Sequence, residues 1–137
     1  MKQRSTRGRL AGSAAAALLA AAVTACGGPR NSLNTDASVC FRALAVANDA
    51  VHHKGSLVGV RRVSARRLSD EMPEVSAAGS APVCLVAFQS DYRAGEVIDA
   101  RPPVAGRYAV VAVTSGTPTL LGARVTDRLP LRFHHRT

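Results

Sequence analysis

The apolar residues between positions 36 and 55 recur at the spacing of an amphipathic helix. Four of them are separated by four, three and four positions: Cys40, Leu44, Ala47 and Val51. A period of 3.6 residues places such positions on one face, which predicts one long helix with its apolar side toward a core. We expect this helix to end at Gly55, because glycine readily adopts the left-handed conformation that closes a helix. His52, His53 and Lys54 would then fill its last turn, where positive charge meets the negative end of the helix dipole.

Short runs rich in valine and alanine predict strands in the rest of the chain. They span residues 57–63 (LVGVRRV), 82–89 (PVCLVAFQ), 107–114 (RYAVVAVT) and 119–126 (TLLGARVT). A last edge strand is expected after Pro130, because apolar side chains alternate there: Leu129, Leu131 and Phe133. Residues 64–72 fit a short helix or a continued strand, with the helix preferred, and residues 73–81 are expected to form a loop.

The order of these elements predicts an α+β fold. Strands that follow one another through short turns favour an antiparallel sheet. We therefore expect one long N-terminal helix packed on one face of a small antiparallel sheet of about four strands.

The chain begins with a basic segment followed by an uncharged, alanine-rich run. Lys2 and three arginines precede residues 10–25 (LAGSAAAALLAAAVTA), which carry no charge. A basic start, a short apolar run and small residues at its end are typical of a secretory signal peptide. The uncharged run is 16 residues long. A membrane-spanning helix needs about 20, so this length disfavours a retained transmembrane anchor.

The end of the apolar run resembles the lipobox of bacterial lipoprotein precursors. Val23-Thr24-Ala25-Cys26 has the branched residue, the two small residues and the cysteine of that motif. The resemblance implies that diacylglycerol is attached to the sulfur of Cys26 and that the chain is cleaved between Ala25 and Cys26. Two acyl chains anchor a protein stably, since each buried methylene contributes about 0.8 kcal/mol. The alternative is an ordinary signal peptide that has a cysteine near its end by chance.

This interpretation divides the chain into three parts. Residues 1–25 are the signal peptide, residues 26–36 a lipidated flexible tether, and residues 37–137 a single small α+β domain. The tether is rich in glycine, proline, asparagine and serine and has no apolar periodicity. The expected location is the extracytoplasmic face of the cell membrane, with the lipid as anchor.

The two remaining cysteines predict a disulfide. With Cys26 occupied by lipid, Cys40 and Cys84 are left in an oxidising compartment, where pairing is the expected outcome. Both residues lie in apolar surroundings, so two free and buried thiols are the alternative.

Charge and aromatic content point to no nucleic-acid partner. The formal net charge is +9, of which the signal peptide carries four, leaving five for residues 26–137. A cationic surface can bind nucleic acid, anionic lipid or an anionic wall polymer. Because the arginines are scattered along the sequence, we attribute them to the composition of a GC-rich genome instead. The few aromatic residues are not interleaved with basic ones, as surfaces that stack single strands require.

No residue set in the chain identifies a catalytic activity. The histidines form two pairs, His52-His53 and His134-His135, which invite a metal-site hypothesis. Adjacent helical residues point about 100° apart, so one pair cannot hold an ion as histidines at i and i+4 do. We therefore expect no metal and no cofactor. The adjacent carboxylates of Asp70 and Glu71 are expected to form a solvated face.

The function expected from the sequence is that of a lipid-anchored, non-catalytic binding module of the cell envelope, with another envelope protein as its partner. A small-ligand or metal-binding lipoprotein is the first alternative, and a small envelope enzyme is the second.

Overall fold

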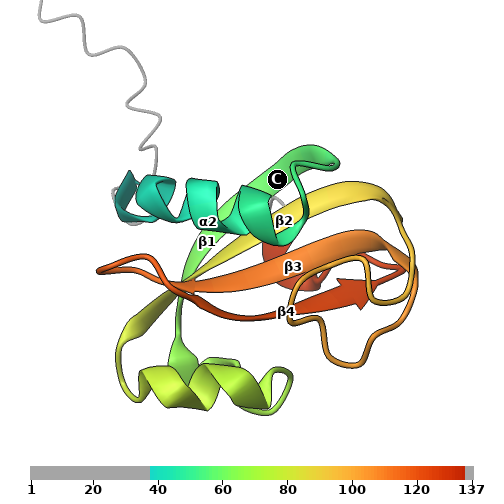
Figure 1. Ribbon diagram of the computed structural model, residues 1–137. Helices are drawn as coiled ribbons and strands as arrows, with labels where there is room; N and C mark the ends of the chain where they lie inside the picture. Colours follow the sequence, from blue (N-terminus) through green and yellow to red (C-terminus); the bar gives the residue numbers. More distant parts are fainter. Residues whose placement is uncertain (1–37, 135–137) are drawn as a thin grey trace, which may run out of the picture.

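The computed structural model describes residues 38–134, which form a four-stranded sheet with helical segments on both faces (Figure 1). The predicted signal peptide, the residues that resemble a lipobox, with Cys26, and the predicted tether lie outside these described residues. The elements, with η denoting a 3₁₀ helix, are η1 (Val39–Arg42), α2 (Ala43–Ala50), β1 (Ser56–Ser64), η2 (Ala65–Arg67), η3 (Pro73–Ala78), β2 (Pro82–Tyr92), β3 (Gly106–Thr114), β4 (Leu120–Thr126) and η4 (Leu131–Phe133). Within the described range, no helix is both long and apolar enough to cross a membrane.

The sheet is an antiparallel meander in the order β1-β2-β3-β4. The prediction of a small antiparallel sheet of about four strands is confirmed, and the four strands lie where the valine-rich runs place them. The hairpin between β3 and β4 closes at Thr114, whose backbone N–H donates to the carbonyl oxygen of Thr119 at 3.0 Å. Consecutive strands thus pair with their sequence neighbours, the commonest arrangement in antiparallel sheets, and the short connection is the one between β3 and β4.

Strand β2 lies in the interior of the sheet and is buried on both faces. Its side chains alternate between two cores. One set packs with α2: Cys84, Val86 and Phe88. The other set packs with η2, η3 and η4: Val83, Leu85 and Ala87. The unbroken apolar run of β2 matches a strand that is covered on both sides.

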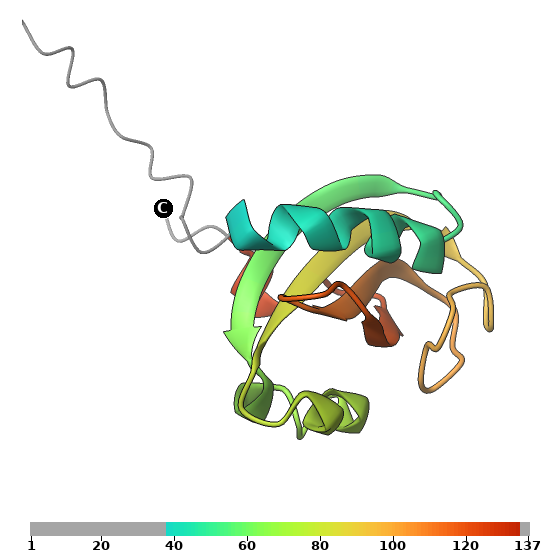
Figure 2. The ribbon, with the colours of Figure 1, turned by 60° about the vertical axis from the view of Figure 1, so that its left-hand side comes forward.

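Helical segments therefore cover both faces of the sheet, whereas the sequence pattern predicted a helix on one face. Figures 1 and 2 show α2 on one side of the strands and η2 and η3 on the other. The side chains that α2 buries are small: Ala43, Ala47 and Ala50. Small side chains at this interface let the helix lie close to the strands.

The prediction of one long N-terminal helix is wrong. The helical segment covers only η1 and α2 and ends at Ala50. The N–H of His52 donates to the carbonyl oxygen of Asp49 at 3.0 Å, and that of His53 donates to Asn48 at 2.8 Å. This pair of bonds is a Schellman closure, with His52 in the left-handed position that glycine usually takes. His52 and His53 have φ of 52° and 56°, so they leave the helix instead of filling its last turn.

The prediction of a last edge strand is also wrong. Leu131–Phe133 forms the 3₁₀ helix η4, which follows Pro130. Phe133 is buried over β1, where a Cβ at Gly59 would lie 3.2 Å from its ring. The glycine therefore makes room for the aromatic side chain. Strand alternation would have placed Leu131 on the same face as Phe133, but 85% of Leu131 is exposed.

The segment between β1 and β2 is more helical than predicted. Ala65–Arg67 forms a 3₁₀ turn, in keeping with the helical preference expected for residues 64–72. Pro73–Ala78, expected to be a loop, is a 3₁₀ helix with proline in its first turn. Proline fits there because the first turn of a helix needs no N–H donor.

Candidate functional site

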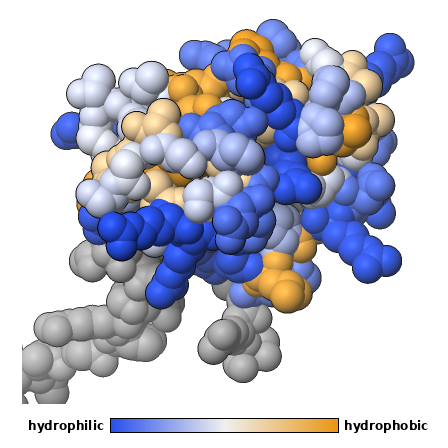
Figure 3. Space-filling model, turned by 90° about the horizontal axis from the view of Figure 1, so that it is seen from below, coloured by the Kyte–Doolittle hydropathy of each residue, from blue (hydrophilic) through white to orange (hydrophobic). Residues whose placement is uncertain are grey.

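Four arginines line a groove beside the edge strand β1. The groove has a volume of about 960 Å³, and its walls come from β1, from η2 and the turn after it, and from η4 with the proline before it: Arg61, Arg62, Val63, Ser64, Arg67, Glu71, Pro130, Leu131 and Arg132. We refer to this site as the arginine groove. Figure 3, which views the molecule from the side of η2 and η3, shows strongly hydrophilic residues over much of this face with apolar ones between them.

The register of the sheet explains how distant arginines come together. Arg61 lies opposite Leu85 in the β1–β2 pair, so both side chains point to the face that η2 and η4 cover. Strand β1 then runs directly into η2, which carries Arg67. On the other side, burial of Phe133 holds η4 against β1 and brings Arg132 to the groove.

Positive charge exceeds negative charge in the arginine groove. Its one carboxylate, Glu71, pairs with the guanidinium of Arg132. The Nε–H of Arg61 donates to the carbonyl oxygen of Arg132 at 3.0 Å, and Arg124 donates to the backbone oxygen of Glu71 at 2.7 Å. These bonds fix the walls, while Arg67 is exposed. Guanidinium groups held this way suit oxyanions, which they bind through two parallel hydrogen bonds.

A second polar cluster joins the end of α2 to the loop after β2. The ammonium of Lys54 donates to both carboxylate oxygens of Glu96 at 2.7 and 2.9 Å and to the carbonyl oxygen of Asp91 at 2.6 Å. The hydroxyl of Tyr92 donates to the carbonyl oxygen of Lys54 at 2.8 Å, and the ammonium lies 5.5 Å from the ring centre. The N–H of Arg93 donates to Glu96 at 2.8 Å. These mutually satisfied groups hold the turn and the loop together.

The same contacts change the acidity of two groups. The hydrogen bond from Lys54, followed by that from the backbone of Arg93, lowers the pKa of Glu96. Burial raises the pKa of Tyr92 to about 12, and the nearby Glu96 carboxylate adds to this increase. The folded protein thus favours an ionised Glu96 and a neutral Tyr92, as a structural clamp requires.

We expect Glu96→Gln to lower the free energy of unfolding at pH 7 and to have little effect at acidic pH. The folded pKa of Glu96 lies below its unfolded value of about 4.3. Its contribution is therefore present above that value and is lost as the pH falls through the folded pKa. Urea unfolding of wild type and variant over the range from pH 7 to acid measures the difference. Substitution of the exposed Asp70 by asparagine is the control. If the loss of unfolding free energy in Glu96→Gln did not change with pH, the ionised carboxylate of Glu96 would not be what holds the turn and the loop together.

The histidine pairs lie in separate parts of the fold. His52 and His53 follow α2, and Nε2 of His53 lies 3.0 Å from a carboxylate oxygen of Asp49. His134 follows η4, with its Nε2 3.1 Å from the carbonyl oxygen of Leu129. His135 is outside the described range. Among residues 38–134, no three histidine, cysteine, aspartate or glutamate side chains are grouped so that they can hold a metal ion.

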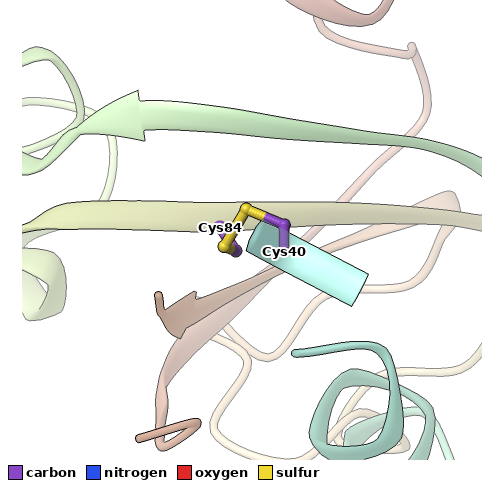
Figure 4. The surroundings of a disulfide bond; sticks show 2 residues. All are labelled: Cys40 and Cys84. Carbon is purple, nitrogen blue, oxygen red and sulfur yellow. A yellow bond between two sulfur atoms is a disulfide. The ribbon is translucent and has the colours of Figure 1, made fainter. Parts of the chain in front are cut away.

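The predicted pairing of Cys40 with Cys84 is present. Figure 4 shows the bond, which joins η1 to β2, and the two Cα atoms are 5.5 Å apart. Both residues are fully buried in the core beneath α2. The bridge therefore attaches the start of the helical segment to an interior strand.

Sequence reasoning did not identify the arginine groove. Two arginine pairs five positions apart, at 61–62 and 66–67, were the only local signal. Arg132 is separated from Arg61 by 71 positions and joins the site only through the packing of η4. Arginines that looked scattered in the sequence are partly gathered by the fold.

Comparison with protein-family models, with curated proteins and with solved structures found no match to this chain. Its function is therefore inferred from its own residues.

Proposed function

We propose that this protein is a lipid-anchored, non-catalytic binding module on the extracytoplasmic face of a bacterial cell membrane. The observation that carries the proposal is the sequence Val23-Thr24-Ala25-Cys26 at the end of an uncharged run with a basic start. Attachment of diacylglycerol to Cys26 gives stable anchoring through two acyl chains. The membrane is then the first partner of the protein.

The disulfide supports export of the chain. Cys40 and Cys84 are bonded to each other, and such bonds persist in oxidising compartments. Cys26 is the remaining cysteine of the three, which leaves its thiol for the lipid.

The arginine groove supports a binding role. It combines guanidinium groups with an exposed leucine, Leu131, and its one carboxylate is held in an ion pair with Arg132. Arginine is enriched at protein interfaces relative to the rest of the protein surface. We further propose another envelope protein as the partner, and crosslinking in intact cells before lysis is the way to capture it.

We expect Cys26→Ala to abolish lipidation, because the substitution removes the sulfur that accepts the diacylglycerol. Mass spectrometry and membrane fractionation of the protein from a bacterial host measure the result. The variant should lack the diacylglyceryl mass and be lost from the membrane fraction, whereas Ala25→Gly, which keeps a small residue before the cysteine, should behave as wild type. An unchanged mass and unchanged membrane retention in Cys26→Ala would refute the lipoprotein assignment.

A further inference from the structure

The arginine groove lies on the side of the domain from which the chain leads back toward Cys26. Figure 2 shows the start of η1, the end of β1, η2 and η4 along the left-hand side of the molecule. Residues 27–37 connect the described domain to Cys26 and are 11 in number. Eleven residues span at most about 40 Å when fully extended. A lipid on Cys26 therefore keeps the domain within this distance of the membrane surface, and the chain enters the domain on this side.

The charge of the groove matches the chemistry of that surface. Three of its guanidinium groups come from separate segments: Arg61 from β1, Arg67 from η2 and Arg132 from η4. Phosphodiester oxygens accept paired hydrogen bonds from such groups. Each arginine near an anionic membrane increases the equilibrium constant for surface contact about fivefold.

Apolar side chains on the same side of the domain suit the membrane interface. Leu131 is 85% exposed at the rim of the groove, directly beside Arg132. Val39 and Phe41 of η1, on the side where the tether joins, are also exposed. Leucine and phenylalanine next to basic residues are the combination that interfacial protein segments bury between headgroups and acyl chains.

We propose that this side of the domain is a membrane-contact surface, in which the arginine groove binds the phosphate groups of anionic phospholipids and Leu131 enters the interface. The inference rests on the proposed lipid anchor, which brings the surface to the bilayer. A domain held in this way turns the loop between β2 and β3, on the right of Figure 2, away from the membrane.

A single tryptophan provides the test, because the chain has none. The protein carrying Leu131→Trp is purified from bacterial membranes and reconstituted with vesicles of phosphatidylcholine, or of phosphatidylcholine with phosphatidylglycerol. We expect a blue shift of the tryptophan emission only with phosphatidylglycerol, and its reversal at high salt. A protein with Ile98→Trp, on the loop between β2 and β3, is the matched control and should show no shift.

Charge variants in the Leu131→Trp background test the groove itself. Arg61→Gln with Arg67→Gln is expected to lower the equilibrium constant for contact about 30-fold, measured by titrating the phosphatidylglycerol fraction. Arg61→Lys with Arg67→Lys should recover only part of the contact, because the charge is kept but the paired hydrogen bonds of the guanidinium groups are lost. Arg101→Gln with Arg107→Gln removes the same charge from exposed positions outside the groove and should have little effect.

The outcomes separate this inference from the lipid anchor. If the protein floats with phosphatidylcholine vesicles but shows no emission shift with phosphatidylglycerol, the membrane-contact surface is wrong and the anchor stands. If it does not float with phosphatidylcholine vesicles, the anchor is wrong. The emission shift with phosphatidylglycerol vesicles then still tests whether the arginine groove binds anionic lipid. A shift caused by polyglutamate and not by phosphatidylglycerol assigns the groove to an acidic protein and overturns the proposal.

Discussion

Replacing both Cys40 and Cys84 by alanine is expected to lower the free energy of unfolding by about 4 kcal/mol. The bond joins residues 44 positions apart, so it removes much conformational freedom from the unfolded chain. A small domain has about 5–15 kcal/mol of stability in total, which makes this a large fraction. Urea unfolding of the oxidised wild type and of the double variant measures the difference.

Chemical reduction of the wild type is the control for this prediction, because it breaks the bond without removing core atoms. The reduced protein should lose a similar amount of stability, and the oxidised protein should expose no thiol from Cys40 or Cys84 until it is reduced. A loss below about 1 kcal/mol in both cases would show that the bond contributes little beyond the packing around it.

Gly55→Ala is expected to cost about 3 kcal/mol, more than a substitution at an ordinary glycine. Gly55 has a φ of 96°, which side chains rarely adopt, and a Cβ there would lie 2.6 Å from the hydroxyl of Tyr92 and 2.8 Å from the carbonyl oxygen of Gln89. Part of the cost is backbone strain. The rest comes from displacing Tyr92, whose hydroxyl bonds to the carbonyl oxygen of Lys54.

Gly95→Ala separates the two contributions to this cost. Gly95 also has a positive φ, of 76°, but a Cβ there would meet no atom within 4 Å. Its substitution should cost only the strain, about 1 kcal/mol. Equal losses at Gly55 and Gly95 in thermal or urea unfolding would show that the close contact with Tyr92 does not matter.

The strands were predictable because local sequence determines them. The run PVCLVAFQ is too apolar for a surface strand, and it became an interior strand that is buried on both sides. What the run does not reveal is the identity of the second covering layer. That layer consists mainly of 3₁₀ helices in stretches of small and polar residues. A few apolar side chains from these segments, such as Leu68, Met72 and Val75, cover this face of the strand. Such short elements have no periodicity to detect.

The end of the helix was mispredicted because two rules for helix termini competed. Gly55 is the glycine that usually marks the end of a helix. The chain nevertheless ends the helix at Ala50, where two histidines follow in the left-handed conformation. Val51 is buried in the core beneath α2, and the turn that follows it directs the chain into β1. Tertiary packing thus decided the boundary, and Gly55 serves the turn into the strand instead.

The arginine groove was beyond sequence reasoning for a different reason. Its two walls meet only because Phe133 packs over Gly59, a contact between segments more than 70 positions apart. The alternation of Leu129, Leu131 and Phe133 suggested a strand, which would have carried Arg132 elsewhere. Sites that form where distant segments meet are visible only once the topology is known.

The position of the disulfide also determines how the domain responds to mechanical force. If Cys26 is fixed in the bilayer, a pull by a partner stretches the tether and reaches the domain at Ser38. Two residues later the force passes through Cys40 and its sulfur into Cys84 of β2, bypassing α2. Strand β2 is hydrogen-bonded to β1 on one side and to β3 on the other, so the load spreads over two ladders of bonds. Helix α2, which follows Cys40 in the chain, therefore lies outside the path of the force.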